Sequence, residues 1–191
     1  MKPIRDHLTD AARLLDAVAA GPLGARVDEA VGRIAAALSA RRPLLVCGNG
    51  GSAADAEHIT GELVGRFLKE RPALKCICLS SSVATLTAWS NDYSYETVFA
   101  RQVEAYGEKD GVLLGLSTSG NSPNVVAAFQ AARRLGMATV AMTGEGGGRL
   151  KELSDVLVDV PSGHTPDIQQ VHLVLYHYLC EAVEARCAAT G

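Results

Sequence analysis

The sequence has no long hydrophobic run, which excludes a protein anchored by membrane-spanning helices. No apolar stretch reaches the roughly 18 residues that such a helix needs. Residues 1–6 also lack the apolar segment of a secretory signal. We therefore expect a cytoplasmic protein with no membrane partner.

Positive charge is not in excess either. The chain has 18 Lys and Arg residues against 21 Asp and Glu residues, a formal net charge of −3. Nucleic acids and anionic membranes are usually bound by a broad positive surface, which this balance does not supply. We expect no nucleic-acid partner, and any bound anion must be held by a local site.

The cysteines show neither the CxxC spacing of zinc sites nor the density of a disulfide scaffold. They are Cys47, Cys76, Cys78, Cys180 and Cys187. The first three lie in strand-like apolar runs, where a free cysteine acts as a small hydrophobic residue. We predict that all are reduced and that none is catalytic.

What the sequence does have is a change of pattern after residue 40. Residues 1–40 carry apolar side chains at helical spacing, interrupted at Gly21 and Pro22, and predict a pair of helices. From residue 43 onward, short apolar runs are followed by Gly or Ser clusters and then by helical periodicity, as in repeated βα units. The 191 residues suffice for one α/β domain and not for two. We predict a single domain over 1–191, with a helical pair at 1–40 and an α/β core at 43–191.

Five of the apolar runs predict strands, at 44–47, 75–79, 112–116, 138–142 and 156–160. Because these runs lack polar alternation, they suit a parallel sheet covered by helices on both faces, a three-layer sandwich. The predicted helices of the core span 53–65, 96–105, 123–135 and 166–185. At two of their starts, Ser122 and Thr165 each precede a proline, so both hydroxyls are predicted caps. The leading helices have no strand partner, which favours packing on the core helices or on another subunit of a homo-oligomer.

The segment GNGGS at 48–52 follows the first predicted strand and opens a helix. Glycines let a ligand approach the backbone, and the free N–H groups of a helix start favour a phosphate. A tight turn capped by Ser52 is the equally balanced alternative. With Ala53 the segment also fits the dinucleotide pattern GxGxxA, but that fold needs an acidic residue after the second strand. Since Ser80, Ser81 and Ser82 stand there, we expect no nucleotide cofactor.

A second loop, STSGNS at 117–122, also lies between a predicted strand and a helix. Hydroxyls and backbone N–H groups can surround a phosphate without a cation, and neither loop contains Lys or Arg. An ordinary Ser/Thr turn with a helix cap is the alternative. Two such loops at the carboxyl ends of neighbouring strands favour binding of an anion.

Two helices carry candidate proton-transfer groups. His58 and Glu62 are four residues apart on the helix after the glycine loop and share one face. Glu62 lies ten residues beyond Ser52, roughly 15 Å along the helix axis, which favours a long sugar phosphate over a triose. Gln169 and His177 are eight residues apart on the last helix and point in nearly the same direction. A solvated pair and a packed histidine are the commoner roles of such residues.

Together these residues resemble the phosphoheptose isomerases, enzymes built on the sugar isomerase (SIS) domain, a flavodoxin-like fold. The resemblance rests on Gly48 to Ser52, His58 with Glu62, Asn91 with Asp92, Ser117 to Ser122, and Gln169 with His177. It covers nearly the whole chain. It implies an aldose–ketose isomerase that converts sedoheptulose 7-phosphate to D-glycero-D-manno-heptose 7-phosphate, the first step of heptose precursor synthesis for lipopolysaccharide or other glycans.

The resemblance also implies a role for each matching position. The phosphate would be held by Ser52, Ser117, Thr118, Ser119 and Ser122. The sugar would be lined by Asn49, Gly50, Gly51, Asn91 and Asp92, with Glu62 and Gln169 also at the substrate. Arg66, one turn beyond Glu62, matches a substrate-contacting arginine of the family, although an ordinary pair with Glu62 is the alternative.

Glu62 is expected to act as the base and His177 as the acid of a reaction that passes through an enediol. Some relatives bind zinc through residues matching His58, Glu62, Gln169 and His177, so one zinc ion per subunit is expected here. The resemblance also implies a homotetramer whose active sites lie between subunits.

Two other interpretations remain open. A non-catalytic SIS protein that binds the replication initiator DnaA would keep the serine loops, but such relatives lose the Glu62 and His177 pair. An isomerase or sensor of another sugar phosphate is also possible, since phosphate loops are indifferent to the sugar. We assign no role to His164 and His172, and we expect both to be exposed.

Overall fold

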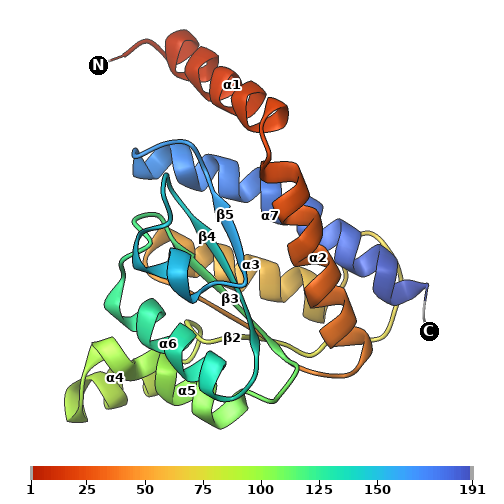
Figure 1. Cartoon of the computed structure of the whole chain (residues 1–191), viewed down its shortest axis with the longest axis vertical. Coiled ribbons are helices and arrows are strands. Elements are labelled where there is room, and N and C mark those ends of the chain that lie inside the picture. Colours follow the sequence, from red (N-terminus) through yellow and green to blue (C-terminus); the bar gives the residue numbers. More distant parts are fainter. Residues whose placement is uncertain (1, 190–191) are drawn as a thin grey trace.

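The computed structural model describes residues 2–189, so residues 1, 190 and 191 of the predicted domain lie outside the described residues. Helices and strands alternate along most of the chain (Figure 1). The helices are α1 Ile4–Ala20, α2 Leu23–Ser39, α3 Gly51–Val64, α4 Val83–Asp92, α5 Val98–Tyr106, α6 Pro123–Arg134 and α7 Thr165–Ala188, with short 3-10 helices η1 Tyr95–Thr97 and η2 Gly148–Leu153. The strands are β1 Leu44–Gly48, β2 Cys76–Cys78, β3 Val112–Ser117, β4 Ala138–Thr143 and β5 Val156–Asp159.

The five strands form one parallel sheet in the order β2-β1-β3-β4-β5. Successive side chains of a strand point to opposite faces, so β1 contributes to two cores. Leu44 and Val46 pack with residues of α2, α3 and α7, whereas Leu45 and Cys47 pack with residues of α5 and α6. The predicted three-layer sandwich with a five-stranded parallel sheet is therefore confirmed.

The two leading helices differ in how they meet this core. α2 buries an apolar stripe that includes Val27, Val31 and Ile34, and it packs beside α7. α1 stands off from the rest of the molecule (Figure 1), with Val18 as its one buried residue and Leu8 61% exposed. The prediction that the pair packs on the core helices is thus confirmed for α2 and not for most of α1.

Two local predictions were wrong, and one helix was not predicted. That helix is α4, in which only Leu86 and Trp89 pack against the core, so its apolar stripe is short. Ser82 caps α4 by accepting a hydrogen bond from the Thr85 N–H at 3.3 Å. Ser122 does precede α6, but its hydroxyl bonds to Ser117 rather than capping the helix. Thr165 is the first residue of α7 and not its cap.

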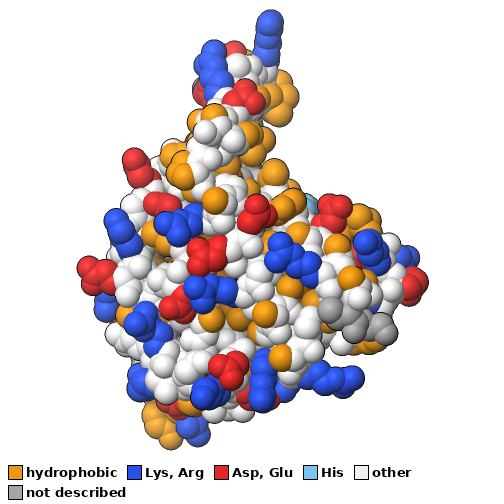
Figure 2. All heavy atoms as spheres, turned by 45° about the vertical axis from the view of Figure 1, so that its right-hand side comes forward, with side chains coloured by type: hydrophobic (Ala, Val, Ile, Leu, Met, Phe, Trp, Pro, Cys, Tyr) orange, Lys and Arg blue, Asp and Glu red, His pale blue; other side chains and the backbone are white. Residues whose placement is uncertain are grey.

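The cysteines behave as small apolar residues. Four are buried, and burial raises the pKa of Cys76 and of Cys180 to about 12, so these thiols stay protonated at neutral pH. No helix within residues 2–189 is long and apolar enough to cross a membrane. On the face drawn in Figure 2, Lys and Arg are interspersed with Asp and Glu, so charge of one sign does not gather there.

Candidate active site

The glycine loop joins β1 to α3 and is closed from the side by α7. The first turn of α3 leaves the N–H groups of Gly51 and Ser52 without intrahelical partners, which suits an anion. Gln169 of α7 lies against this turn, with its Nε2 3.5 Å from the buried Ser52 Oγ. A Cβ on Gly51 would lie only 2.7 Å from Gln169 Nε2, so glycine leaves room for the Gln169 amide against this turn.

Asn49, the polar residue of the glycine loop, is held from two elements. Its side chain exchanges a pair of 2.9 Å hydrogen bonds with Asn124, at the start of α6. The Tyr95 hydroxyl donates to Asn49 Oδ1 at 2.7 Å. The amide is therefore fixed before any ligand arrives, as a preorganised binding group requires.

The serine loop follows β3, the neighbour of β1, so both loops lie at the carboxyl edge of the sheet. Ser117 Oγ and Ser122 Oγ are 2.9 Å apart, and Thr118 Oγ1 is 3.3 Å from Thr165 Oγ1 of α7. Gly120 has a φ of +65°, and a Cβ there would overlap the Gly147 carbonyl. We call residues 49–52 and 117–122 the strand-end loops; they offer hydroxyls and N–H groups and contain no cation.

A chain of polar side chains runs along the contact between α3 and α7. His58 Nε2 lies 3.1 Å from Glu62 Oε1, and His58 Nδ1 lies 3.1 Å from the Tyr176 hydroxyl. That hydroxyl donates to Asp55 Oδ1 at 3.5 Å. Both ring nitrogens of His58 are thus engaged, one toward Glu62 and the other toward Tyr176.

Burial shapes the protonation of this chain. Burial, and then the nearby Asp55 carboxylate, raise the pKa of Tyr176 to about 12, so its phenol is protonated at neutral pH. Burial also raises the pKa of Asp55, and the hydrogen bond from Tyr176 offsets part of this. Glu62 and His58 keep 24% and 42% of their side-chain surface exposed, so a ligand can reach both.

His177 joins the same cluster from α7. Its ring centroid lies 5.0 Å from that of His58 in an edge-to-face arrangement, and Phe67 stacks on it at 6.0 Å and 29°. Glu62 and His177, the base and acid expected from the sequence, therefore both adjoin His58 within one chain. We call Asp55, His58, Glu62, Tyr176 and His177 the α3–α7 seam.

Three predicted substrate residues are not joined to this cluster. Asn91 and Asp92 are exposed at the end of α4, where Asn91 Nδ2 donates to Asp92 Oδ1 at 2.9 Å. Arg66 is exposed and pairs with Glu70 at 3.2 Å, so the alternative of a pair with Glu62 was wrong.

The expectation that His172 is exposed was also wrong. Its ring is fully buried, with Nε2 3.1 Å from the Thr143 carbonyl oxygen, and burial lowers its pKa to about 4. It lies on the face of α7 that packs on the sheet. His164 is exposed, as predicted, and lies 3.1 Å from Asp167.

The zinc ligands that the resemblance implies are only partly assembled. The 3.1 Å between His58 Nε2 and Glu62 Oε1 is close to the separation of about 3.3 Å between two ligand atoms of tetrahedral zinc. Within residues 2–189, no group of three His, Cys, Asp or Glu side chains is placed to hold a metal ion. The donor types fit zinc, but this arrangement supplies only the pair.

Sequence reasoning missed Asp55, Tyr176 and Phe67. Asp55 had a usable signal, because it lies three residues before His58 and so shares its helix face. Tyr176 and Phe67 had none, since they meet His58 and His177 only through tertiary packing.

Comparisons with known proteins agree with the fold. The SIS domain family model matches residues 6–144. A phosphoheptose isomerase of Crocosphaera subtropica is 52% identical over 163 residues, 85% of this chain and 83% of the relative; one of Desulfovibrio desulfuricans is 49% identical over 181 residues, 95% and 86%. The solved phosphoheptose isomerase of Neisseria gonorrhoeae superimposes with a TM-score of 0.89 at 35% identity, over 95% of this chain and 97% of the other. The chain therefore belongs to the SIS domain family and, within it, to the phosphoheptose isomerases, which are aldose–ketose isomerases.

Proposed function

We propose that this protein converts sedoheptulose 7-phosphate to D-glycero-D-manno-heptose 7-phosphate. Relatives of about 50% identity carry the name phosphoheptose isomerase, which supports a seven-carbon sugar phosphate. The observation that carries the proposal is the convergence of Glu62, His58 and His177 on one seam that begins at an anion-binding loop. The product would supply heptose for lipopolysaccharide or another glycan, and the reaction would take place in the cytoplasm.

The strand-end loops would anchor the phosphate. Helix starts and hydroxyl groups can hold a phosphate without a cation, so the charge of the ligand is met by N–H and O–H dipoles. Ser52 and Thr118 both lie where α7 comes close, so a phosphate there would be enclosed from several elements. A sugar chain leaving this point along α3 would reach Glu62 only if it is long.

The reaction needs one base and one acid. Glu62 would remove a proton from C1 of the open-chain ketose while His177 donates a proton to O2, which gives the 1,2-enediol. Neutral His177 would then take the proton from O1, and Glu62 would return its proton to C2 to give the aldose. His58 would orient the Glu62 carboxylate through their 3.1 Å contact.

Two further features belong to the proposal. Zinc at His58, Glu62, Gln169 and His177 would polarise the sugar carbonyl, and no step above depends on it. Metal content measured on purified protein tests this: we expect one zinc per chain in the wild type, and loss of zinc in His58→Ala.

A tetramer is the second feature, and the exposed apolar residues of α1 are available for subunit contact. Light scattering measures the mass of the assembly in solution.

The test is turnover of sedoheptulose 7-phosphate by purified protein in D₂O, followed by NMR. We expect aldose product with solvent deuterium entering at C2, because a carboxylate base exchanges its proton with water. His177→Ala should lose about hundredfold or more in kcat, the scale for a general acid. His164→Ala is the matched control, since that imidazole is exposed and lies outside the seam.

Each other outcome has a meaning. Turnover of a different sugar phosphate, with none of the heptulose, would refute the substrate. Full activity of His177→Ala would refute the mechanism. A protein that turns over no sugar phosphate but binds DnaA would be the non-catalytic relative.

A further inference from the structure

We propose that Arg71 and Glu184 form a buried clamp that positions the segment between α3 and β2 against the acid–base pair. This inference rests on the proposed function, because it assigns positioning residues to the same site. The segment, residues 65–75, has no helix or strand of its own. It carries Arg66, which the resemblance places at the substrate, and Phe67, whose ring lies on His177.

Glu184 is the centre of the clamp. It lies on α7, seven residues beyond His177. Its carboxylate accepts hydrogen bonds from the N–H groups of Phe67, Leu68 and Lys69 at 2.8, 2.6 and 2.8 Å. Three consecutive N–H groups on one carboxylate leave the backbone little freedom. Burial tends to raise the pKa of Glu184, but these donors and then Arg71 outweigh it and lower that pKa, so the group is ionised at neutral pH.

Arg71 completes the clamp from the segment itself. Its Nε lies 3.3 Å from Glu184 Oε1, and both side chains are 1% exposed. The guanidinium also donates to the carbonyl oxygens of Glu62 at 2.8 Å and Gly65 at 3.1 Å. These carbonyls lie at the end of α3, where helical partners run out, so Arg71 secures the turn that carries the proposed base.

A buried ion pair is poorly explained as a source of stability. Removing two charges from water costs free energy that their attraction often fails to recover, so apolar residues of similar size are commonly as good. What this pair does supply is direction. Glu184 accepts hydrogen bonds from backbone N–H groups and the Arg71 fork donates to backbone carbonyls, so the two side chains hold the backbone in one position.

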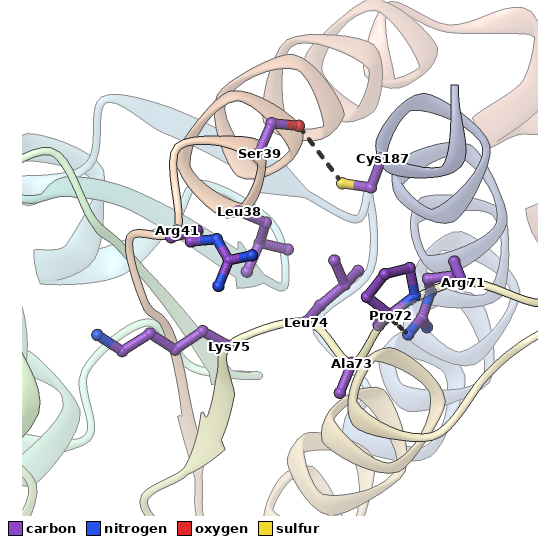
Figure 3. A pocket seen from close by; sticks show the side chains of 9 residues that line it. All are labelled: Leu38, Ser39, Arg41, Arg71, Pro72, Ala73, Leu74, Lys75 and Cys187. Carbon is purple, nitrogen blue, oxygen red and sulfur yellow. Dashed lines mark hydrogen bonds between the residues drawn. The ribbon is translucent and has the colours of Figure 1, made fainter. Parts of the chain in front are cut away.

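Packing holds the segment at Phe67 and Leu74, which lie against the core, but leaves an open side at residues 71–73. A cavity of about 390 Å³ lies there, near the start of β2 and the ends of α2 and α7 (Figure 3). Arg71, Pro72 and Ala73 all line it, and Arg71 bonds to the Pro72 carbonyl at its edge. Since residues 71–73 face this space, packing fixes the two ends of the segment and the polar contacts of the clamp fix its middle.

The experiment compares Glu184→Gln with the wild type by two readouts. In the glutamine variant, an NH₂ group would face at least one of the three backbone N–H groups. Two donors cannot form a hydrogen bond, so the segment should shift. We expect kcat to fall about tenfold, the scale for losing a supporting partner, with KM changed less than threefold. In NMR spectra of the imidazole groups, the His177 signals should move in the same direction as in Phe67→Leu, because Glu184→Gln shifts the Phe67 ring away from His177 and Phe67→Leu deletes it.

Asp155→Asn is the matched control. That carboxylate accepts the Thr139 N–H at 2.8 Å, far from the seam in sequence and structure, so its loss should lower the melting temperature without moving kcat or the His177 signals. Arg71→Lys keeps the positive charge and loses the planar guanidinium with its several donors. Its kcat should lie between those of the wild type and Glu184→Gln. This variant replaces Glu184→Gln in the test if Glu184→Gln does not fold.

A folded Glu184→Gln with unchanged kcat and unchanged His177 signals would overturn the clamp. If Glu184→Gln does not fold, unchanged values in Arg71→Lys and unmoved His177 signals in Phe67→Leu would overturn it instead. An inactive wild type would refute the proposed function alone, because the NMR comparison would still test the clamp.

Discussion

The strand-end loops and the α3–α7 seam meet at the start of α3, yet they are built from different chemistry. The loops use backbone N–H groups, hydroxyls and amides, and Gly120 lets the serine loop pass close to the backbone of Gly147. The seam uses ionisable side chains, with Glu62 and His177 each in contact with His58. Under the proposed function, this difference separates phosphate binding from proton transfer in space.

The two regions should therefore affect different kinetic parameters, the loops KM and the seam kcat. Dipoles that hold a phosphate contribute equally to substrate and transition state, so their loss should raise KM. Groups that move protons act only in the transition state, so their loss should lower kcat. The comparison fails if variants of the two regions change the same parameter.

The largest expected effect is that of Glu62→Gln, which removes the proposed base and keeps its shape. We expect kcat to fall about hundredfold or more with KM within about threefold, as for loss of a general base. Glu57→Gln, an exposed carboxylate on the same helix, is the control. Steady-state kinetics that show a raised KM and an unchanged kcat would place Glu62 with the binding groups.

A smaller effect is expected for Ser119→Ala in the serine loop. Loss of one hydroxyl from a charged phosphate costs on the order of 1.5 kcal/mol, or about tenfold in KM, with kcat nearly unchanged. Ser81→Ala removes a serine that bonds only to the Cys78 carbonyl and should change neither parameter. A fall in kcat alone would break the division between the regions.

Tyr176→Phe should have a milder effect, confined to the seam. It deletes the hydroxyl that links His58 to Asp55 and leaves the ring packed, a loss of about 1 kcal/mol and thus about fivefold in kcat. Tyr178→Phe is the matched control, because that exposed hydroxyl bonds to Asp28 at 2.7 Å. Equal kcat values in the two variants would show that the Tyr176 hydroxyl does not contribute to the proposed active site.

The smallest effect on turnover is expected at His172, which marks where the seam ends and the core begins. Its folded pKa of about 4 lies below the ordinary 6.5, so the unfolded chain binds the proton first as pH falls. The free energy of unfolding should therefore drop from pH 6.5 toward pH 4, by about 2 kcal/mol at pH 5 relative to pH 7.

Urea unfolding of the wild type and of His172→Gln at these two pH values measures the contribution. The variant should lose most of this pH dependence and keep its kcat at pH 7. An identical pH dependence in both proteins would show that His172 does not titrate as its burial indicates.

The sequence predicted the strands well because each is a continuous apolar run, and the parallel sheet followed from the lack of polar alternation. It failed for α4, where only Leu86 and Trp89 pack against the core and the apolar stripe is too short to predict a helix. It failed again on α7 at His172, which was expected to be exposed and is buried, unlike His177. Helical spacing gives their direction relative to each other, and only the packing of α7 shows which of them faces the sheet.

The sequence by itself determined the order of βα units, the two loops at helix starts and the shared face of His58 and Glu62, since all of these are local consequences of residue type and spacing. Tertiary structure alone decided that His177 meets His58, that Tyr176 and Phe67 complete their surroundings, and that Glu184 holds the segment beside them. These contacts join residues about 110 to 120 positions apart, and no local periodicity encodes a distance of that kind.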